Sequence, residues 1–167
     1  IANGPRLLIA DEPTTALDVT IQAQVMDVLE GVCQGNHASM ILVTHDLGLV
    51  AETADRIAVM YSGRVAETAP TDALFERPSH PYTLGLLDSL PSLDEDHDEL
   101  RSIPGQPPDM AARPPGCAFH PRCARGQGRP HCSGDRPDLR TIGTAHESAC
   151  HYAEEAAGDA PPREAAQ

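Results

Sequence analysis

Residues 7–18 read LLIADEPTTALD, in which four apolar residues run directly into two acids. Leu7 to Ala10 contain no polar break, a pattern typical of a β-strand covered on both faces of a parallel sheet. Asp11 and Glu12 follow directly at the end of that strand. Ligand-binding side chains of α/β folds gather at the carboxyl ends of parallel strands. The sequence therefore predicts that this acid pair faces a ligand.

A helix and a second strand follow. Asp18 has the side chain of an N-cap, and apolar residues then recur at helical spacing as far as Gly35 and Asn36. Residues 39–44, SMILVT, form a second apolar run that ends at His45. Strand, helix and strand make a right-handed βαβ unit, which brings both strand ends to one edge of a parallel sheet. We therefore expect His45 to share an edge with the two acids.

These three side chains suit phosphoryl chemistry. A carboxylate such as Asp11 can hold Mg²⁺ directly or through water, and the next acid, Glu12, can orient or deprotonate a water molecule. His45 can bond a γ-phosphate or position the attacking water. Taken singly, an acid pair often starts a helix and a histidine often follows a strand without any function. The joint order and spacing of the three favour the phosphoryl interpretation.

Further elements are predicted as far as Leu90. Ser62 and Gly63 have the composition of a two-residue hairpin turn between antiparallel strands. The predicted elements are a helix over 47–54, strands over 56–61 and 64–68, a capped helical turn over 71–75 and a helix over 81–90.

The composition changes after Leu90, so an α/β domain is predicted over 1–90. Residues 91–116 are rich in proline and acids and predict a linker or extended arm. Residues 117–151 are rich in Cys, His, Arg and Pro and lack the apolar residues for a core of their own, so something other than hydrophobic burial must hold them. Residues 152–167 are low in complexity and are expected to be disordered.

Charge and composition exclude several classes of function. The net charge is −13, which argues against nucleic-acid binding because phosphate contacts need a positive field. All 12 basic residues are arginine, so no lysine can grip a phosphate as in a P-loop. There is no apolar run of about 18 residues and no secretory signal, so a cytosolic chain is expected. The chain begins with Ile1 rather than Met, which leads us to expect an upstream segment.

Residues 7–18 resemble the Walker B strand and D-loop of ATP-binding-cassette ATPases, and VTHD, residues 43–46, resembles their switch-histidine loop. The resemblance implies an α/β fold: part of the parallel sheet of a P-loop NTPase with flanking helices, followed by a small irregular Cys-rich region. On this likeness Asp11 serves Mg²⁺, Glu12 is the general base or the water-positioning acid, and His45 senses the γ-phosphate of ATP.

The same likeness implies partners. Asp18 would lie in the loop that faces a second ATPase subunit, identical or different, unless it is only an N-cap. Closure of two such subunits on ATP would drive transmembrane permease subunits from the cytoplasmic face of the bacterial inner membrane. The Walker A motif, glutamine loop and LSGGQ signature of the family are not found in this sequence. The parent protein is expected to be an ATPase, and the chain as given is expected to bind ATP weakly or not at all.

Two further strings narrow the resemblance. The run over 56–91 is similar to the oligopeptide and dipeptide importer ATPases, and their His-Pro-Tyr-Thr string is matched by residues 80–83. TTALDVTIQAQV, residues 14–25, matches the same group. The string at 80–83 also has the composition of a helix start, with proline in the first turn. The implied function is peptide import, and the alternatives are import of nickel or another small solute, or a non-catalytic metal-binding fragment.

Four cysteines are candidate metal ligands. Their intervals of five, eight and seventeen residues fit neither a zinc-finger pair nor a ferredoxin run. Their density in a coreless segment of a cytosolic chain favours a metal over disulfides. They are Cys117, Cys123, Cys132 and Cys150.

Peptide-importer ATPases carry a similar C-terminal cysteine group, and some are thought to bind an iron–sulfur cluster there. The resemblance therefore implies a [4Fe-4S] cluster, with structural Zn²⁺ as the first alternative and free thiols or disulfides as the second. The interval before Cys132 looks long for the family, so His131 is an alternative ligand. Cys33 lies on the apolar face of the first helix and is expected to be a small buried residue.

Overall fold

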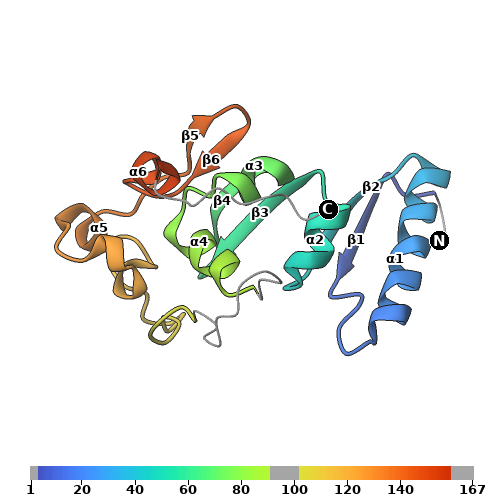
Figure 1. The fold of residues 1–167 in the computed structure, drawn as a ribbon, viewed down its shortest axis with the longest axis horizontal. Coiled ribbons are helices and arrows are strands. Elements are labelled where there is room, and N and C mark those ends of the chain that lie inside the picture. The colour runs from blue at the N-terminus through green and yellow to red at the C-terminus, as the bar shows by residue number, and fades with distance from the viewer. Residues whose placement is uncertain (1–3, 91–101, 159–167) are drawn as a thin grey trace, which may run out of the picture. The chain divides into compact units, whose positions relative to one another are not determined.

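The computed structural model describes residues 4–90 and 102–158 (Figure 1). The chain divides between Thr53 and Ala54 into two compact units, and each is described by itself. This division differs from the boundary predicted near Leu90, because strands that follow the expected linker pair with the sheet built by residues 56–70. The fold is α/β with one parallel and one antiparallel sheet.

Unit 1 contains the predicted βαβ arrangement. Its elements are β1 (Leu7–Asp11), α1 (Val19–Asn36), β2 (Ser39–Val43) and α2 (Leu47–Thr53). β1 and β2 pair in parallel, with Ile9 opposite Ile41. α1 ends at the predicted stop, Gly35 and Asn36, and His37 caps it: this residue takes the left-handed conformation with φ 51° and donates its N–H to the last carbonyls of the helix.

In the part of the chain that the structure describes, one face of the β1–β2 sheet is largely exposed to solvent. α1 lies along one side of the two strands (Figure 1), and Ala10 and Met26 are buried there. On the other face the exposed fractions are 47% for Leu7, 64% for Ile9 and 49% for Ile41. The prediction that both faces are covered therefore does not hold for the described residues. The result is an apolar strip of alternate residues on adjacent strands.

We expect this strip to make the chain self-associate, because monomers rarely leave contiguous apolar surface in water. Replacing Ile9 and Ile41 together by serine should weaken the association about tenfold or more, since a fully buried isoleucine contributes roughly 1.5–3 kcal/mol. Light scattering across a concentration series measures the effect. Met60→Ser is a matched control, because Met60 is 59% exposed but lies in unit 2. Equal association of the double variant and the parent would contradict the prediction.

Unit 2 is built on an antiparallel sheet. Its strands are β3 (Arg56–Tyr61), β4 (Arg64–Pro70), β5 (Arg140–Gly143) and β6 (His146–Ser148), in the order β3-β4-β6-β5. The predicted hairpin is confirmed, since Tyr61 pairs with Arg64 across Ser62 and Gly63. Both turn residues have positive φ, 50° and 73°, as a type I′ turn requires.

Short helices complete unit 2. They are α3 (Thr71–Glu76), α4 (Pro81–Asp88), α5 (Pro130–Gly134) and α6 (Ala153–Gly158), with 3₁₀ turns at His120–Arg122 and Ala124–Gly126. α6 occupies part of the tail expected to be disordered, because Ala153 and Ala156 are buried. Residues 102–116 contain no helix or strand, while 91–101 and 159–167 lie outside the described residues. None of the described helices combines the length and apolar character needed to cross a membrane.

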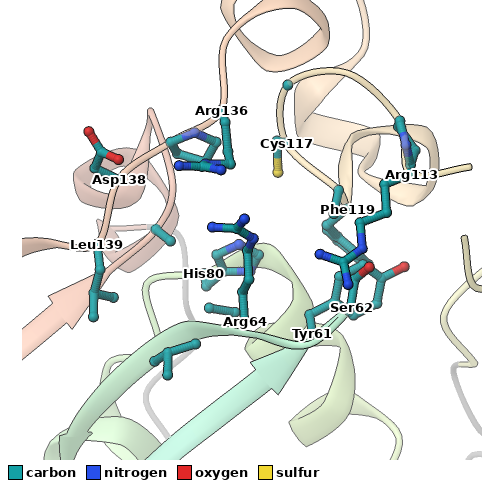
Figure 2. A pocket seen from close by; sticks show the side chains of 17 residues that line it. Tyr61, Ser62, Arg64, His80, Arg113, Cys117, Phe119, Arg136, Asp138 and Leu139 are labelled. Atoms are coloured by element: carbon teal, nitrogen blue, oxygen red, sulfur yellow. The ribbon is translucent and has the colours of Figure 1, made fainter. Parts of the chain in front are cut away.

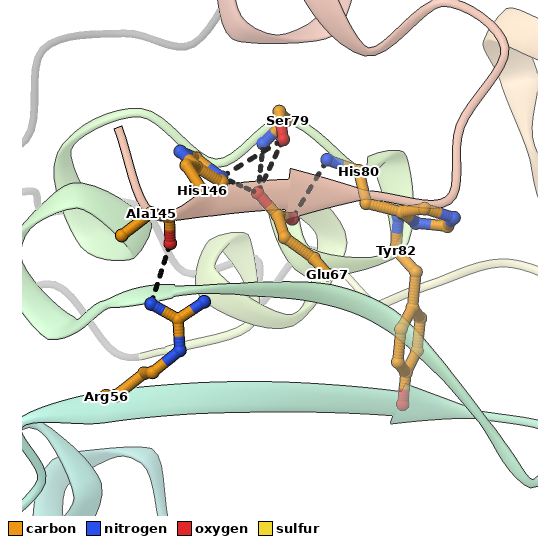
Figure 3. Close-up of polar contacts among 7 residues, drawn as sticks. All are labelled: Arg56, Glu67, Ser79, His80, Tyr82, Ala145 and His146. Carbon is orange, nitrogen blue, oxygen red and sulfur yellow. Dashed lines mark hydrogen bonds and ion pairs between the residues drawn. The ribbon is translucent and has the colours of Figure 1, made fainter. Parts of the chain in front are cut away.

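A buried carboxylate joins three parts of unit 2 (Figure 3). Glu67, in β4, is fully buried, and its Oε1 accepts hydrogen bonds from the backbone N–H and the hydroxyl of Ser79, both at 2.7 Å. Its Oε2 accepts from the backbone N–H of His80 at 2.9 Å. The Nε2 atom of His146, in β6, lies 2.7 Å from Oε1. This polar cluster and the β4–β6 pairing link the Cys-rich region to the hairpin.

Candidate functional site

The candidate site lies at the carboxyl ends of β1 and β2. Asp11 is the last residue of β1 and pairs with Val43, and the N–H of Glu12 donates to the carbonyl of Val43 at 2.8 Å. His45 follows β2 by two residues, and its Nδ1 lies 3.5 Å from Oε1 of Glu12. The two side chains are 78% and 51% exposed. The structure thus brings His45 and Glu12 to one edge, as the βαβ pattern predicts.

Local backbone geometry orients Glu12. Its φ is 47°, in the left-handed region that residues with a side chain seldom adopt, and such conformations cluster at functional sites. The hydroxyl of Thr15 donates to Oε2 at 2.9 Å. The carboxylate is therefore held from one side by Thr15 while its other oxygen faces His45.

Asp11 and Asp18 have different surroundings. The side chain of Asp11 is exposed and makes no hydrogen bond or ion pair to any residue in the described ranges, so both of its oxygens are open to a metal ion or water. Asp18 caps α1, because its Oδ1 accepts the N–H of Ile21 at 3.0 Å. One oxygen of Asp18 is thus committed to the helix.

Sequence reasoning missed the role of Asp46. Its Oδ1 caps α2 by accepting the N–H of Leu49, and its Oδ2 accepts from the side-chain amide of Gln22 at 2.9 Å. The hydrogen bond from Gln22, followed by that from Leu49, lowers the pKa of Asp46, so the carboxylate stays charged at neutral pH. The loop that carries His45 is therefore tied to α1. An aspartate directly before a helical run is the signal that predicts such a cap.

The four candidate cysteine ligands gather in one part of unit 2, and all are free thiols. Cys117 donates its N–H to the carbonyl of Cys132 at 3.0 Å. A Cβ placed on Gly126 would lie 3.5 Å from the Cβ atoms of both Cys123 and Cys132. A Cβ on Gly116 would lie 2.7 Å from the carbonyl oxygen of Cys132, so the loops pack too closely there for a side chain.

Burial raises the pKa of the Cys117, Cys132 and Cys150 thiols. Desolvation raises the pKa of Cys150 to about 11, and neighbouring Cys117, Cys123 and Cys132 add to the effect. Across residues 4–90 and 102–158, no three His, Cys, Asp or Glu side chains converge as metal ligands do. The donor set fits a thiophilic metal in number and softness, but the side chains are not arranged around one. His131, the alternative ligand, is exposed and pairs with Asp135.

Comparison with known proteins finds relatives of the chain. The C-terminal region of oligopeptide/dipeptide transporters matches residues 66–132. A putative peptide import ATP-binding protein of Brucella abortus is 56% identical over 127 residues, which are 76% of this chain and 38% of that protein. The oligopeptide transport ATP-binding protein AppD of Bacillus subtilis is 50% identical over 152 residues, 91% of this chain and 46% of the relative. Over most of its length the chain is thus similar to ATP-binding proteins of oligopeptide and dipeptide transport. The dipeptide transport ATP-binding protein DppD of Escherichia coli is 48% identical over 158 residues, 95% of this chain and 48% of its own length. This chain therefore spans about half the length of these relatives or less.

The His-Pro-Tyr-Thr string at residues 80–83 starts a helix, as its composition predicts. His80 caps α4, with Nδ1 accepting the N–H of Tyr82 at 3.0 Å, and Pro81 occupies the first turn. Burial lowers the pKa of His80 to about 4, so its ring is neutral at physiological pH. The rings of Tyr61, Tyr82 and Phe119 pack against one another with centroids 4.6–5.4 Å apart. The string is thus a structural anchor between the hairpin and the Cys-rich region.

Proposed function

We propose that this chain carries the hydrolytic edge of the ATP-binding subunit of a bacterial peptide importer. The observation that carries the proposal is the 3.5 Å approach of His45 to Glu12 at the ends of two adjacent parallel strands. Glu12 orients or deprotonates the attacking water, and His45 contacts the γ-phosphate. Asp11 holds Mg²⁺, which would neutralise charge on the phosphates.

The wider assignment rests on the family. In this proposal β1 and β2 belong to the parallel sheet of a P-loop NTPase, and Asp18 caps α1 while facing a second ATP-binding subunit. The assembly would bind transmembrane permease subunits at the cytoplasmic face of the inner membrane. The relatives' names specify peptide, oligopeptide and dipeptide transport, which favours peptides over nickel or another small solute.

A chimaera tests the proposal. The chain would replace the matching 158 residues of the Escherichia coli dipeptide transport ATP-binding protein, in cells that lack the native protein. We expect labelled dipeptide uptake to be restored, and Ni²⁺ uptake measured in parallel to stay at the level of the deletion strain. The proposal fails if the chimaera assembles at the membrane and binds ATP but supports no dipeptide uptake.

We propose further that Cys117, Cys123, Cys132 and Cys150 hold a [4Fe-4S] cluster. Support comes from the proximity of the four thiols, which are soft donors that suit iron or zinc, and from the scarcity of apolar residues in the segment that carries them. When bound, the cluster would cross-link loops that have little apolar core.

We expect the anaerobically purified chain to contain iron and acid-labile sulfide and to absorb broadly in the visible range. Cys123→Ser should abolish both signals, whereas Cys33→Ser should keep them, because Cys33 lies in α1 of unit 1. A colourless chain with one equivalent of zinc would replace the cluster by a Zn²⁺ site. A chain free of metal would overturn the proposal of a metal centre altogether.

A further inference from the structure

Unit 2 contains a pocket of about 470 Å³ that the proposed nucleotide chemistry does not use (Figure 2). Its volume is within the range of small-molecule sites. Residues from the β3–β4 hairpin form one wall, and residues 113–119 and 136–139 form others. All of the lining residues belong to unit 2, whereas Glu12 and His45 belong to unit 1.

Three arginines line this pocket without a partner. Arg64, Arg113 and Arg136 are exposed, and none of them makes a hydrogen bond or ion pair to a residue that the structure describes. Nearby arginines behave differently, since Arg140 pairs with Glu154 at 2.5 Å and Arg129 with Glu155 at 2.8 Å. Other arginines of unit 2 thus form ion pairs with glutamates, whereas the three pocket arginines do not pair with any described acid.

The pocket is lined mainly by positive charge, whereas the chain as a whole is negatively charged. The net charge is −13, but Asp138 is the only acid among the lining residues. In Figure 2 the carboxylate of Asp138 points away from the guanidinium groups, and those of Arg64 and Arg136 point toward the middle of the pocket. Three guanidinium groups around one space repel one another, and an anion between them relieves that repulsion. Each guanidinium can also donate two parallel hydrogen bonds to one phosphate.

Most of the other lining residues are apolar or aromatic. Phe119 and Ala66 are buried, and the ring of Phe119 lies beside the neutral ring of His80. These apolar side chains can pack against a flat or apolar group, but they do not stabilise an inorganic ion. The ligand that fits both parts carries a compact anionic head and an apolar body.

We propose that this pocket binds a small organic phosphate, with the phosphate between Arg64, Arg113 and Arg136 and the organic part against Phe119. Cys117 also lines the wall, so the pocket adjoins the cysteine group. A phosphate of this kind can be free in solution or can belong to a lipid headgroup. The shared chemistry is the phosphate ester, and the test separates the two sources.

Binding of phenyl phosphate to the whole 167-residue chain tests the proposal, with calorimetry as the readout. We expect saturable binding that weakens with salt and is stronger than that of inorganic phosphate or phenol. Arg64→Gln and Arg136→Gln should each weaken it about tenfold, the loss expected for one charge-assisted hydrogen bond. Arg77→Gln, which removes an exposed charge outside the pocket, should leave it unchanged. Glu12→Gln should also leave it unchanged, which separates this test from that of the nucleotide edge.

Vesicles of phosphatidylglycerol in phosphatidylcholine form the second arm. Binding to vesicles that is lost in both pocket variants, without binding of phenyl phosphate, supports the same pocket with a lipid headgroup as the source. The proposal is overturned if neither probe binds, or if the pocket variants bind as the parent does. Circular dichroism of each variant checks folding, and because Arg64 and Arg136 make no hydrogen bond or ion pair to a described residue the spectra should match.

Discussion

Replacing Glu67 by alanine is expected to lower the free energy of unfolding of unit 2 by about 3–5 kcal/mol, because several buried donors lose their acceptor at roughly 1–3 kcal/mol each. The segment that precedes α4 and strand β6 lose a common acceptor, because the side chain receives hydrogen bonds from Ser79, His80 and His146. Those donors stay buried, away from water that could replace the carboxylate. The effect should therefore exceed that of a simple cavity of the same size.

Urea unfolding followed by tyrosine fluorescence measures this change, since the chain has no tryptophan and Tyr61 and Tyr82 pack together in unit 2. Glu76→Ala is the matched control, because Glu76 is an exposed glutamate at the end of α3. The free energy of unfolding of this control should stay within about 0.5 kcal/mol of the parent's, as for most surface substitutions. A Glu67→Ala midpoint equal to that of the control would show that the buried cluster contributes nothing.

Replacing Glu12 by glutamine in the chimaera is expected to slow ATP hydrolysis by about 10²–10⁴-fold, the usual contribution of a general base. ATP affinity should change little, because the substituted amide can still accept the hydrogen bond from Thr15 and keeps the shape of the turn. The expected signature is thus a fall in kcat with KM nearly constant.

Glu52→Gln provides the control for charge, since Glu52 is exposed on α2 of the same unit. It should hydrolyse ATP at the parent's rate. If Glu12→Gln hydrolyses ATP at the parent's rate, Glu12 does not act as the general base. A loss of ATP affinity that accounts for the whole defect would assign Glu12 to binding instead.

The elements that the sequence predicts well are those with local signals. β1 and β2 follow from apolar runs, α1 from helical spacing after Asp18, and the hairpin from Ser62 and Gly63. The meeting of Glu12 and His45 could be predicted because right-handed βαβ units leave no other edge for them. In each case the decisive information lies within a few dozen residues.

The parts that escaped prediction depend on distant partners. β6 consists of His146, Glu147 and Ser148, which lack strand periodicity, and it forms because it can pair with β4. Glu67 looks like a solvent-facing strand residue, yet it is fully buried because its partners arrive from elsewhere in the chain. The alternation of a strand shows which residues share a face, and it does not show what later covers that face. α6 is a similar case, since low complexity conceals two alanines that become buried.

The central claim is that Glu12 and His45 act on one phosphate from adjacent strand ends. A double-mutant cycle on ATP turnover in the chimaera, with Glu12→Gln, His45→Ala and the pair, tests it most directly. Because both groups serve the same step, the double variant should be scarcely slower than the worse single variant. Losses that multiply across the cycle would mean that the two side chains act independently, and would contradict the site.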